Sequence, residues 1–138
     1  MSTVLAEHTY TRLLVLAPNL DLLSGECASE PDGQRRLWLR IIEQTPYSTH
    51  CRLSEYSGQG RAEVEELVVE LRVYHDAHVA DMLSYRNRFG GHDVFENRVL
   101  DRCDLARKRE LNFFVWKWLG HCLARGHRMV DALEGVHS

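Results

Sequence analysis

The chain has 138 residues, of which 44% are hydrophobic and 27% are charged. This is the length of one ordinary domain with enough apolar residues for a core, so we exclude a multidomain enzyme and a disordered tail and expect a single domain over 1–138. The formal net charge of −3 also excludes the general positive field on which non-specific nucleic-acid binding depends.

The first predicted element is an N-terminal helix over 4–17. Apolar side chains recur there at the spacing of one helical face, at Ala6, Tyr10, Leu13, Leu14 and Ala17. The helix ends at Pro18, because proline cannot continue the backbone hydrogen-bond ladder. Glycine, proline, asparagine and aspartate are then frequent over 19–34, which we interpret as a loop.

Four strands are predicted in the middle of the chain, where the apolar pattern changes from a period of about 3.6 residues to a period of about 2. They cover 36–45, 47–56, 67–74 and 78–86. The links between them are too short for crossover helices, so the strands should pair as a four-stranded antiparallel meander. With helices at both ends, this pattern predicts an α+β fold.

A long C-terminal helix is predicted over 104–125. Its broad apolar face contains Trp118, and we expect that face to pack on the sheet. Phe113 falls among the polar positions and Trp116 flanks the apolar face. These two rings form a candidate protein interface, although scattered surface aromatics are normal. Residues 127–138 are predicted to be a loosely ordered tail.

The sequence does not predict a membrane or exported protein. The N-terminus has no basic segment before an apolar run, and the longest apolar-rich stretch, 111–123, is interrupted and shorter than the roughly 20 residues that a bilayer requires. We therefore expect a cytoplasmic protein. Its four cysteines contain no C-x-x-C pair, so we expect free thiols.

Four blocks of the sequence carry a resemblance to a known family. In chain order they are Arg12-Leu13-Leu14 with Pro18, Glu43 to Thr49, Leu71 to Asp81, and Asn112 with Phe114, Trp118-Leu119, Cys122-Leu123-Ala124 and Gly126. Their order and spacing are similar to those of the YqiB-like family, a bacterial domain of unknown function. The resemblance implies a compact α+β domain with no established activity. It does not extend to Phe113, Trp116 or His78, so a site built on these residues would be particular to this chain.

His75 and Asp76 are candidate catalytic residues, because imidazole and carboxylate groups serve acid–base chemistry and bind divalent metals. On a strand and turn, however, neighbouring side chains point to opposite sides, so three ligands would not converge. We therefore predict no metal site and no cofactor. The structural alternative is that Asp76 caps a tight turn and that His75 forms a hydrogen bond across the sheet.

Arginine and aromatic side chains gather on one predicted face of the sheet. They share one parity along the strands: Arg36, Trp38, Arg40, His50, Arg52, Arg72 and Tyr74. Such a face can bind phosphates while it stacks a base or a sugar. We therefore single out four candidate ligand-binding residues for an anionic small molecule: Arg40, Arg52, Arg72 and Tyr74.

Two other interpretations of this face are open. In the first, Arg40, Arg52 and Arg72 form cross-strand pairs with Glu70 and cation–π contacts with Trp38 and Tyr74. In the second, a terminal helix or a second subunit covers the face, which would make Trp38 and Ile42 part of a core.

Two functions are consistent with these patterns. The preferred one is a small binding or adaptor protein that acts on a partner, or on a second copy, through a sheet face or through Phe113 and Trp116. The alternative is a small enzyme or ligand-binding domain for a phosphorylated metabolite or nucleotide. That alternative requires a concave pocket in which His75, Asp76 and at least two of the candidate arginines converge. The sequence has no nucleophile elbow and no glycine-rich phosphate loop, which argues against an enzyme.

Overall fold

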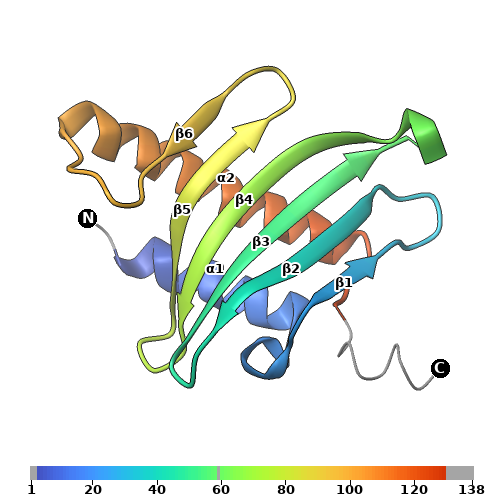
Figure 1. The fold of residues 1–138 in the computed structure, drawn as a ribbon, viewed down its shortest axis with the longest axis horizontal. Coiled ribbons are helices and arrows are strands. Elements are labelled where there is room, and N and C mark those ends of the chain that lie inside the picture. Colours follow the sequence, from blue (N-terminus) through green and yellow to red (C-terminus); the bar gives the residue numbers. More distant parts are fainter. Residues whose placement is uncertain (1–2, 59, 130–138) are drawn as a thin grey trace.

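The computed structural model describes residues 3–58 and 60–129, which form an antiparallel sheet packed against two helices (Figure 1). Helix α1 (Thr3–Leu16) precedes the sheet and helix α2 (Arg102–Ala124) follows it. The strands lie side by side in chain order: β1 (Glu26–Ser29), β2 (Arg36–Gln44), β3 (Ser48–Ser57), β4 (Val64–Tyr74), β5 (Val79–Asn87) and β6 (His92–Val94). Two short 3₁₀ helices, η1 (Leu20–Leu22) and η2 (Gly60–Ala62), occupy links between these elements. The predicted α+β class, both helices and the antiparallel meander are confirmed.

The described residues form six strands rather than the predicted four. Strand β1 and helix η1 lie inside 19–34, which we interpreted as a loop, and β6 follows the last predicted strand. With four and three residues, β1 and β6 are too short to show an alternating pattern. Pairing with a longer neighbour determines their position instead, as where Cys27 lies opposite Leu39 of β2.

One face of the sheet forms the core together with both helices. Alternate residues of β2, β3 and β4 are buried there: Leu37, Leu39, Cys51, Leu53, Leu67, Val69, Leu71 and Val73. Helix α2 adds Leu111, Val115 and Trp118 to this core. The Trp118 indole Nε1 donates to Glu55 Oε1 of β3 at 3.3 Å, which confirms that this face of the helix packs on the sheet.

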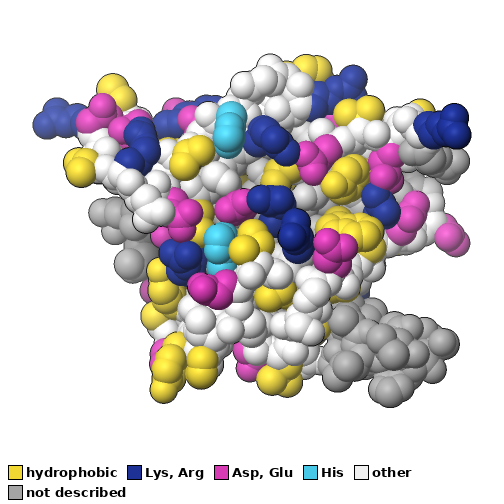
Figure 2. All heavy atoms as spheres, in the orientation of Figure 1, with side chains coloured by type: hydrophobic (Ala, Val, Ile, Leu, Met, Phe, Trp, Pro, Cys, Tyr) yellow, Lys and Arg dark blue, Asp and Glu magenta, His cyan; other side chains and the backbone are white. Residues whose placement is uncertain are grey.

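The opposite face of the sheet is open, because the described part of the chain places both helices on the core side (Figure 1). The interpretation in which a terminal helix covers this face is therefore wrong. Trp38 is only partly buried and Ile42 is exposed. Charged side chains of both signs are mixed across the open face (Figure 2).

The ends of α2 are stabilised by local interactions. At its start, Asp104 N donates to Asp101 Oδ1 at 2.8 Å and Asp101 N donates to Asp104 Oδ2 at 3.0 Å, which is a capping box. At its end, Gly126 has a φ of +91°, a conformation that glycine adopts without strain. Neither described helix combines the length and the apolar content needed to span a bilayer.

The chain after α2 is packed over 127–129, so the predicted loose tail is wrong for these three residues. His127 is buried and its Nδ1 lies 3.0 Å from Ser29 Oγ of β1. Met129 is also buried, and its backbone N donates to Leu16 O of α1 at 2.7 Å. The rest of the predicted tail, 130–138, lies outside the described residues.

Candidate functional site

His75 has a structural partner at the turn between β4 and β5. Its Nε2 lies 2.7 Å from the Thr49 hydroxyl, which itself donates to Gln44 Oε1. The Gln44 Nε2 then donates to Leu20 O at 2.8 Å and to Leu23 O at 3.0 Å. Since the Thr49 hydroxyl donates its hydrogen to Gln44, its oxygen accepts a hydrogen bond from His75 Nε2. This chain of hydrogen bonds links the turn to η1 and matches the structural interpretation of His75.

Asp76 does not join this chain of hydrogen bonds and is exposed. Across residues 3–58 and 60–129, no three His, Cys, Asp or Glu side chains come close enough together to hold a metal ion.

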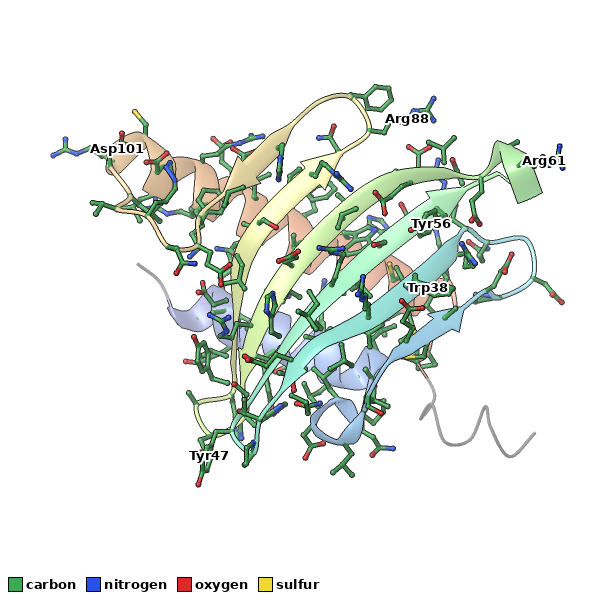
Figure 3. All side chains as sticks on the ribbon, in the orientation of Figure 1. Trp38, Tyr47, Tyr56, Arg61, Arg88 and Asp101 are labelled. Carbon is green, nitrogen blue, oxygen red and sulfur yellow. The ribbon has the colours of Figure 1, made fainter. Side chains whose placement is uncertain are left out.

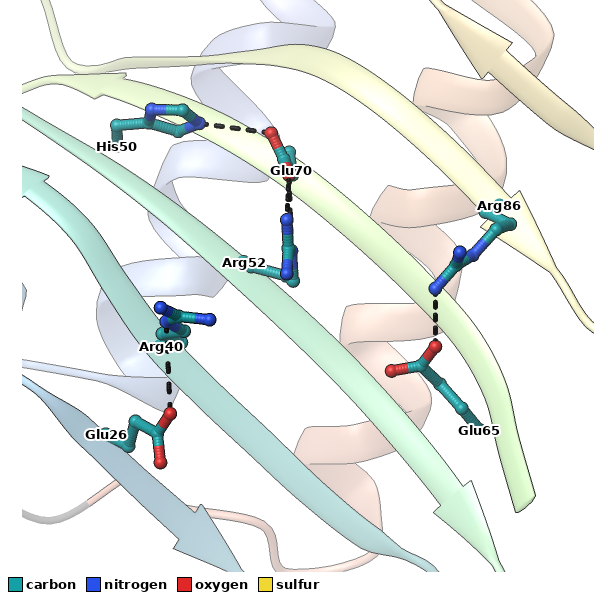
Figure 4. A network of polar contacts seen from close by, with 7 residues as sticks. All are labelled: Glu26, Arg40, His50, Arg52, Glu65, Glu70 and Arg86. Atoms are coloured by element: carbon teal, nitrogen blue, oxygen red, sulfur yellow. Dashed lines mark hydrogen bonds and ion pairs between the residues drawn. The ribbon is translucent and has the colours of Figure 1, made fainter.

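On the open face, Glu70 of β4 lies between two basic groups of β3 (Figure 4). Arg52 Nη2 donates to Glu70 Oε1 at 2.6 Å, and His50 Nε2 lies 3.2 Å from Glu70 Oε2. Partial burial raises the pKa of Glu70, but the hydrogen bonds from Arg52 and His50 outweigh burial, so this pKa lies below its ordinary value. Arg52 thus already has an anionic partner.

The other candidate arginines are also paired within the chain. Arg40 Nε lies 3.9 Å from Glu26 Oε1, and Arg72 Nη2 lies 3.3 Å from Glu96 Oε2. In the described residues, nine of the fifteen arginines form ion pairs: Arg35, Arg36, Arg40, Arg52, Arg72, Arg86, Arg88, Arg98 and Arg107. The interpretation based on cross-strand pairs with Glu70 therefore holds for Arg52, whereas Arg40 and Arg72 pair with other glutamates of the chain.

The aromatic residues of this face take part in the same network, although with a different arginine than expected. The Arg36 guanidinium lies 4.8 Å from the ring centre of Trp38 and 4.9 Å from that of Tyr56. Trp38 and Tyr56 come from adjacent strands at one end of the sheet (Figure 3). We expected cation–π contacts at Trp38 and Tyr74 from Arg40, Arg52 or Arg72. At Trp38, the arginine that forms this contact is Arg36 instead.

One of the candidate ligand-binding residues lines a hollow on the open face. Arg52 lines a hollow of about 360 Å³ on the open face together with Glu70, Ser84 and His92. Neither His75 nor Asp76 lines this hollow, and of the candidate arginines only Arg52 does so.

A larger and mostly apolar groove lies between the two helices. It has a volume of about 700 Å³, and its lining comes from α1 and α2: Val4, Leu5, His8, Ala106, Arg109, Glu110, Phe113 and Trp116. Phe113 is 50% exposed, and its ring centre lies 5.6 Å from that of Trp116. The two aromatic residues that we predicted as a contact patch thus lie in one groove.

The Trp116 side chain is held in place from the opposite helix. The Arg12 guanidinium of α1 lies 4.0 Å from the ring centre of Trp116, and its Nη1 donates to Trp116 O at 2.7 Å. These contacts fix both the ring and the backbone of α2 at this point.

A small pit of about 80 Å³ adjoins the groove, and Leu5 and Arg109 line both. The pit also has two polar groups, the Asp81 carboxylate of β5 and the Asn112 amide of α2. Lys108 Nζ donates to Asp81 Oδ1 at 2.8 Å, and Lys108 itself is buried. The apolar groove therefore ends in a polar pit beside an ion pair whose lysine is buried.

Sequence reasoning did not identify the pit, although one signal was available. Lys108 lies three residues before Leu111 and seven before Val115, so it belongs to the buried face of α2. A lysine at such a position requires an acidic partner. The helical period could have located this partner near α2, but could not have identified it as Asp81.

Comparisons with known proteins agree on one family. The family model described as "Protein of unknown function (DUF1249)" matches residues 12–128. Relatives named "Uncharacterized protein YqiB" occur in Escherichia coli strain K12, in strain CFT073 of serotype O6:H1 and in serotype O157:H7. Each is 31% identical over 124 residues, which is 88% of this chain and 86% of the relative. No solved structure matches the chain. The resemblance to the YqiB-like family is confirmed. The chain therefore belongs to the DUF1249 family, whose function is not established.

Proposed function

We propose that this domain is a binding protein that docks an apolar segment of a partner protein in the groove between α1 and α2. The observation that carries the proposal is the groove itself, whose volume is about 700 Å³ and whose lining is mostly apolar. Phe113 keeps half of its surface exposed there. Exposed apolar surface gathered in one concave patch is typical of interaction sites.

The aromatic side chains of the groove are suited to act as binding anchors. Tryptophan and other bulky aromatics carry a large share of the binding energy at protein interfaces. Trp116 is already held by Arg12, so docking would cost little of its rotamer freedom. The partner therefore meets a surface that is formed before it binds.

The open face of the sheet is a weaker candidate for the same role. Its arginines face glutamates of the same chain, so a partner would have to displace existing ion pairs before it could form new ones. Binding in the groove does not require the displacement of ion pairs, because the lining of the groove is mostly apolar.

The test is a selection of random peptides displayed on phage against the full-length protein, with Phe113→Ser as the variant. We expect the selected peptides to bind Phe113→Ser at least about tenfold more weakly than the unchanged protein, because the lost anchor supplies more than about 1.4 kcal/mol. The matched control is Phe89→Ser, which removes an exposed ring outside the groove, in the link between β5 and β6. Binding to this control should not change.

Two results contradict the proposal. The first is that no peptide is enriched, or that the selected peptides bind Phe113→Ser as well as they bind the unchanged protein. The second is a dimer, seen by sedimentation, that Phe113→Ser converts to a monomer. A dimer of this kind would assign the groove to a second copy of the chain instead of a partner protein.

A further inference from the structure

We infer that the segment docked in this groove carries a carboxylate side chain beside its apolar anchor, and that this carboxylate binds Arg109 at the mouth of the pit. The inference rests on the proposed function and specifies the chemistry of the partner. Its basis is the position of Arg109, which lines both the groove and the pit.

Among the described residues that line the two cavities, Arg109 is the only Arg or Lys. It has no ion pair within the described chain, in contrast to nine other arginines. Its five N–H donors remain available in a fork that matches the two oxygens of a carboxylate.

The two acidic residues among the described lining residues each form an ion pair with a residue other than Arg109. Asp81 accepts from Lys108 Nζ at 2.8 Å, and Glu110 Oε2 lies 3.5 Å from Arg107 Nη1. Neither carboxylate lies within ion-pair distance of Arg109 in the described residues. Arg109 is therefore a cation of the lining with no ion-pair partner among the described residues, while Glu110 of the same groove shares Arg107 with Asp93.

The charge at the pit favours an acidic side chain of the partner over a basic one. Asp81 is the only acid among the described residues that line the pit, and the buried Lys108 compensates its charge. Arg109 then leaves the pit with one uncompensated positive charge. A lysine or arginine of the partner would meet this charge directly, whereas an aspartate or glutamate would neutralise it.

The pit has room for the end of such a side chain. Its volume is about 80 Å³, whereas one water molecule requires about 10–15 Å³ of such space. The Asn112 amide lines the same pit and supplies N–H donors that a second carboxylate oxygen can accept. Apolar contacts in the groove and one charge-assisted contact in the pit would then fix the direction of the bound segment.

The experiment uses the peptides selected by phage display against the full-length protein. We expect them to share an aspartate or glutamate at a constant spacing from an apolar residue. Changing that acid to its amide should weaken binding to the unchanged protein about tenfold, as expected for an engaged charge pair. The same change should have no effect on binding to Arg109→Gln, because the partner of the acid is then absent.

Two further variants sharpen the result. A separate selection against Arg109→Glu should enrich lysine or arginine at the position of the acid. Arg102→Gln removes another arginine of α2 that is exposed and forms no ion pair within the described chain, so it is the matched control and should bind the original peptides normally.

The outcomes separate this inference from the proposed function. If peptides depend on Phe113 but share no acid, or if amidation is equally costly on Arg109→Gln, the carboxylate inference is wrong and the docking groove stands. If no selected peptide requires Phe113 for binding, the groove is not a docking site and both proposals are wrong.

Discussion

The lack of a side chain at Gly120 on α2 makes room for the Arg12 guanidinium of α1. A Cβ atom at Gly120 would collide with Arg12 Nη1, the same nitrogen that donates to Trp116 O. The close approach of the two helices on this side of the groove therefore depends on a glycine inside a helix. That glycine has a cost, because glycine in a helix interior is about 1 kcal/mol less favourable than alanine.

This relationship predicts that Gly120→Ala has opposite effects on stability in the unchanged protein and in an Arg12→Ala background. In the unchanged protein the new methyl group displaces Arg12, and the lost hydrogen bond and cation–π contact should exceed the gain in helix propensity, for a net destabilisation of about 1 kcal/mol. In an Arg12→Ala background only the propensity gain remains, so Gly120→Ala should stabilise by about 0.5–1 kcal/mol. Urea unfolding of the four proteins measures both values. Equal effects in the two backgrounds would show that Arg12 does not require Gly120.

The ion pair between the buried Lys108 and the partly exposed Asp81 predicts that removing the acid costs more stability here than at an exposed pair. Asp81→Asn leaves the buried Lys108 ammonium without its anion and should destabilise the protein by about 2–3 kcal/mol. The matched control is Asp93→Asn, because Asp93 pairs with the more exposed Arg107 at 3.4 Å and should contribute less than about 1 kcal/mol. The free energy of unfolding of both variants, from urea titration, gives the comparison. Similar losses for the two would contradict the assignment of Lys108 as a buried charge.

The strands and helices that could be predicted from the sequence are those long enough to repeat their pattern. Alternation over 36–45 placed Leu37 and Leu39 in the core, where both are fully buried. The pairing of Arg52 with Glu70 was among our interpretations, since both lie on one face, and the register places them directly opposite each other. By contrast, β1 and β6 and the packing of His127 depend on contacts with distant segments and leave no local period.

The candidate site shows the same limit. The helical period was sufficient to place Phe113 outside the core face of α2. It could not show that the N-terminal turns of α1 would supply the opposite wall through Val4 and His8, because that depends on how the two helices pack. The sequence also could not predict that Arg109 has no ion-pair partner among the described residues, since it does not reveal which of the fifteen arginines are paired.

The contacts of Glu70 with Arg52 and His50 predict that the protein loses stability at acidic pH. The pKa of Glu70 in the folded protein lies below its ordinary value of 4.5 because the hydrogen bonds from Arg52 and His50 outweigh burial. A carboxylate with a lowered pKa stabilises the fold above its unfolded pKa, and this contribution is lost as the pH falls through the folded pKa. Urea unfolding should therefore show a difference between the unchanged protein and Glu70→Gln near neutral pH that shrinks below pH 4.5. Glu43→Gln, at an exposed glutamate of β2, is the control and should show no such change. A difference that is constant with pH would refute the role of these hydrogen bonds.

His127 predicts a second pH dependence, in a separate range. Burial lowers its pKa below the ordinary value of 6.5, so between the two pKa values the unfolded chain binds a proton that the folded chain does not. Stability should therefore rise with pH through this range and fall as the pH drops below 6.5. In His127→Gln this part of the pH dependence should disappear, whereas His121→Gln, at an exposed histidine of α2, should keep it. Unfolding free energies measured at several pH values for the three proteins decide the question. Parallel curves for the unchanged protein and His127→Gln would mean that His127 is not held neutral against Ser29, and that the packing of 127–129 onto β1 does not persist in solution.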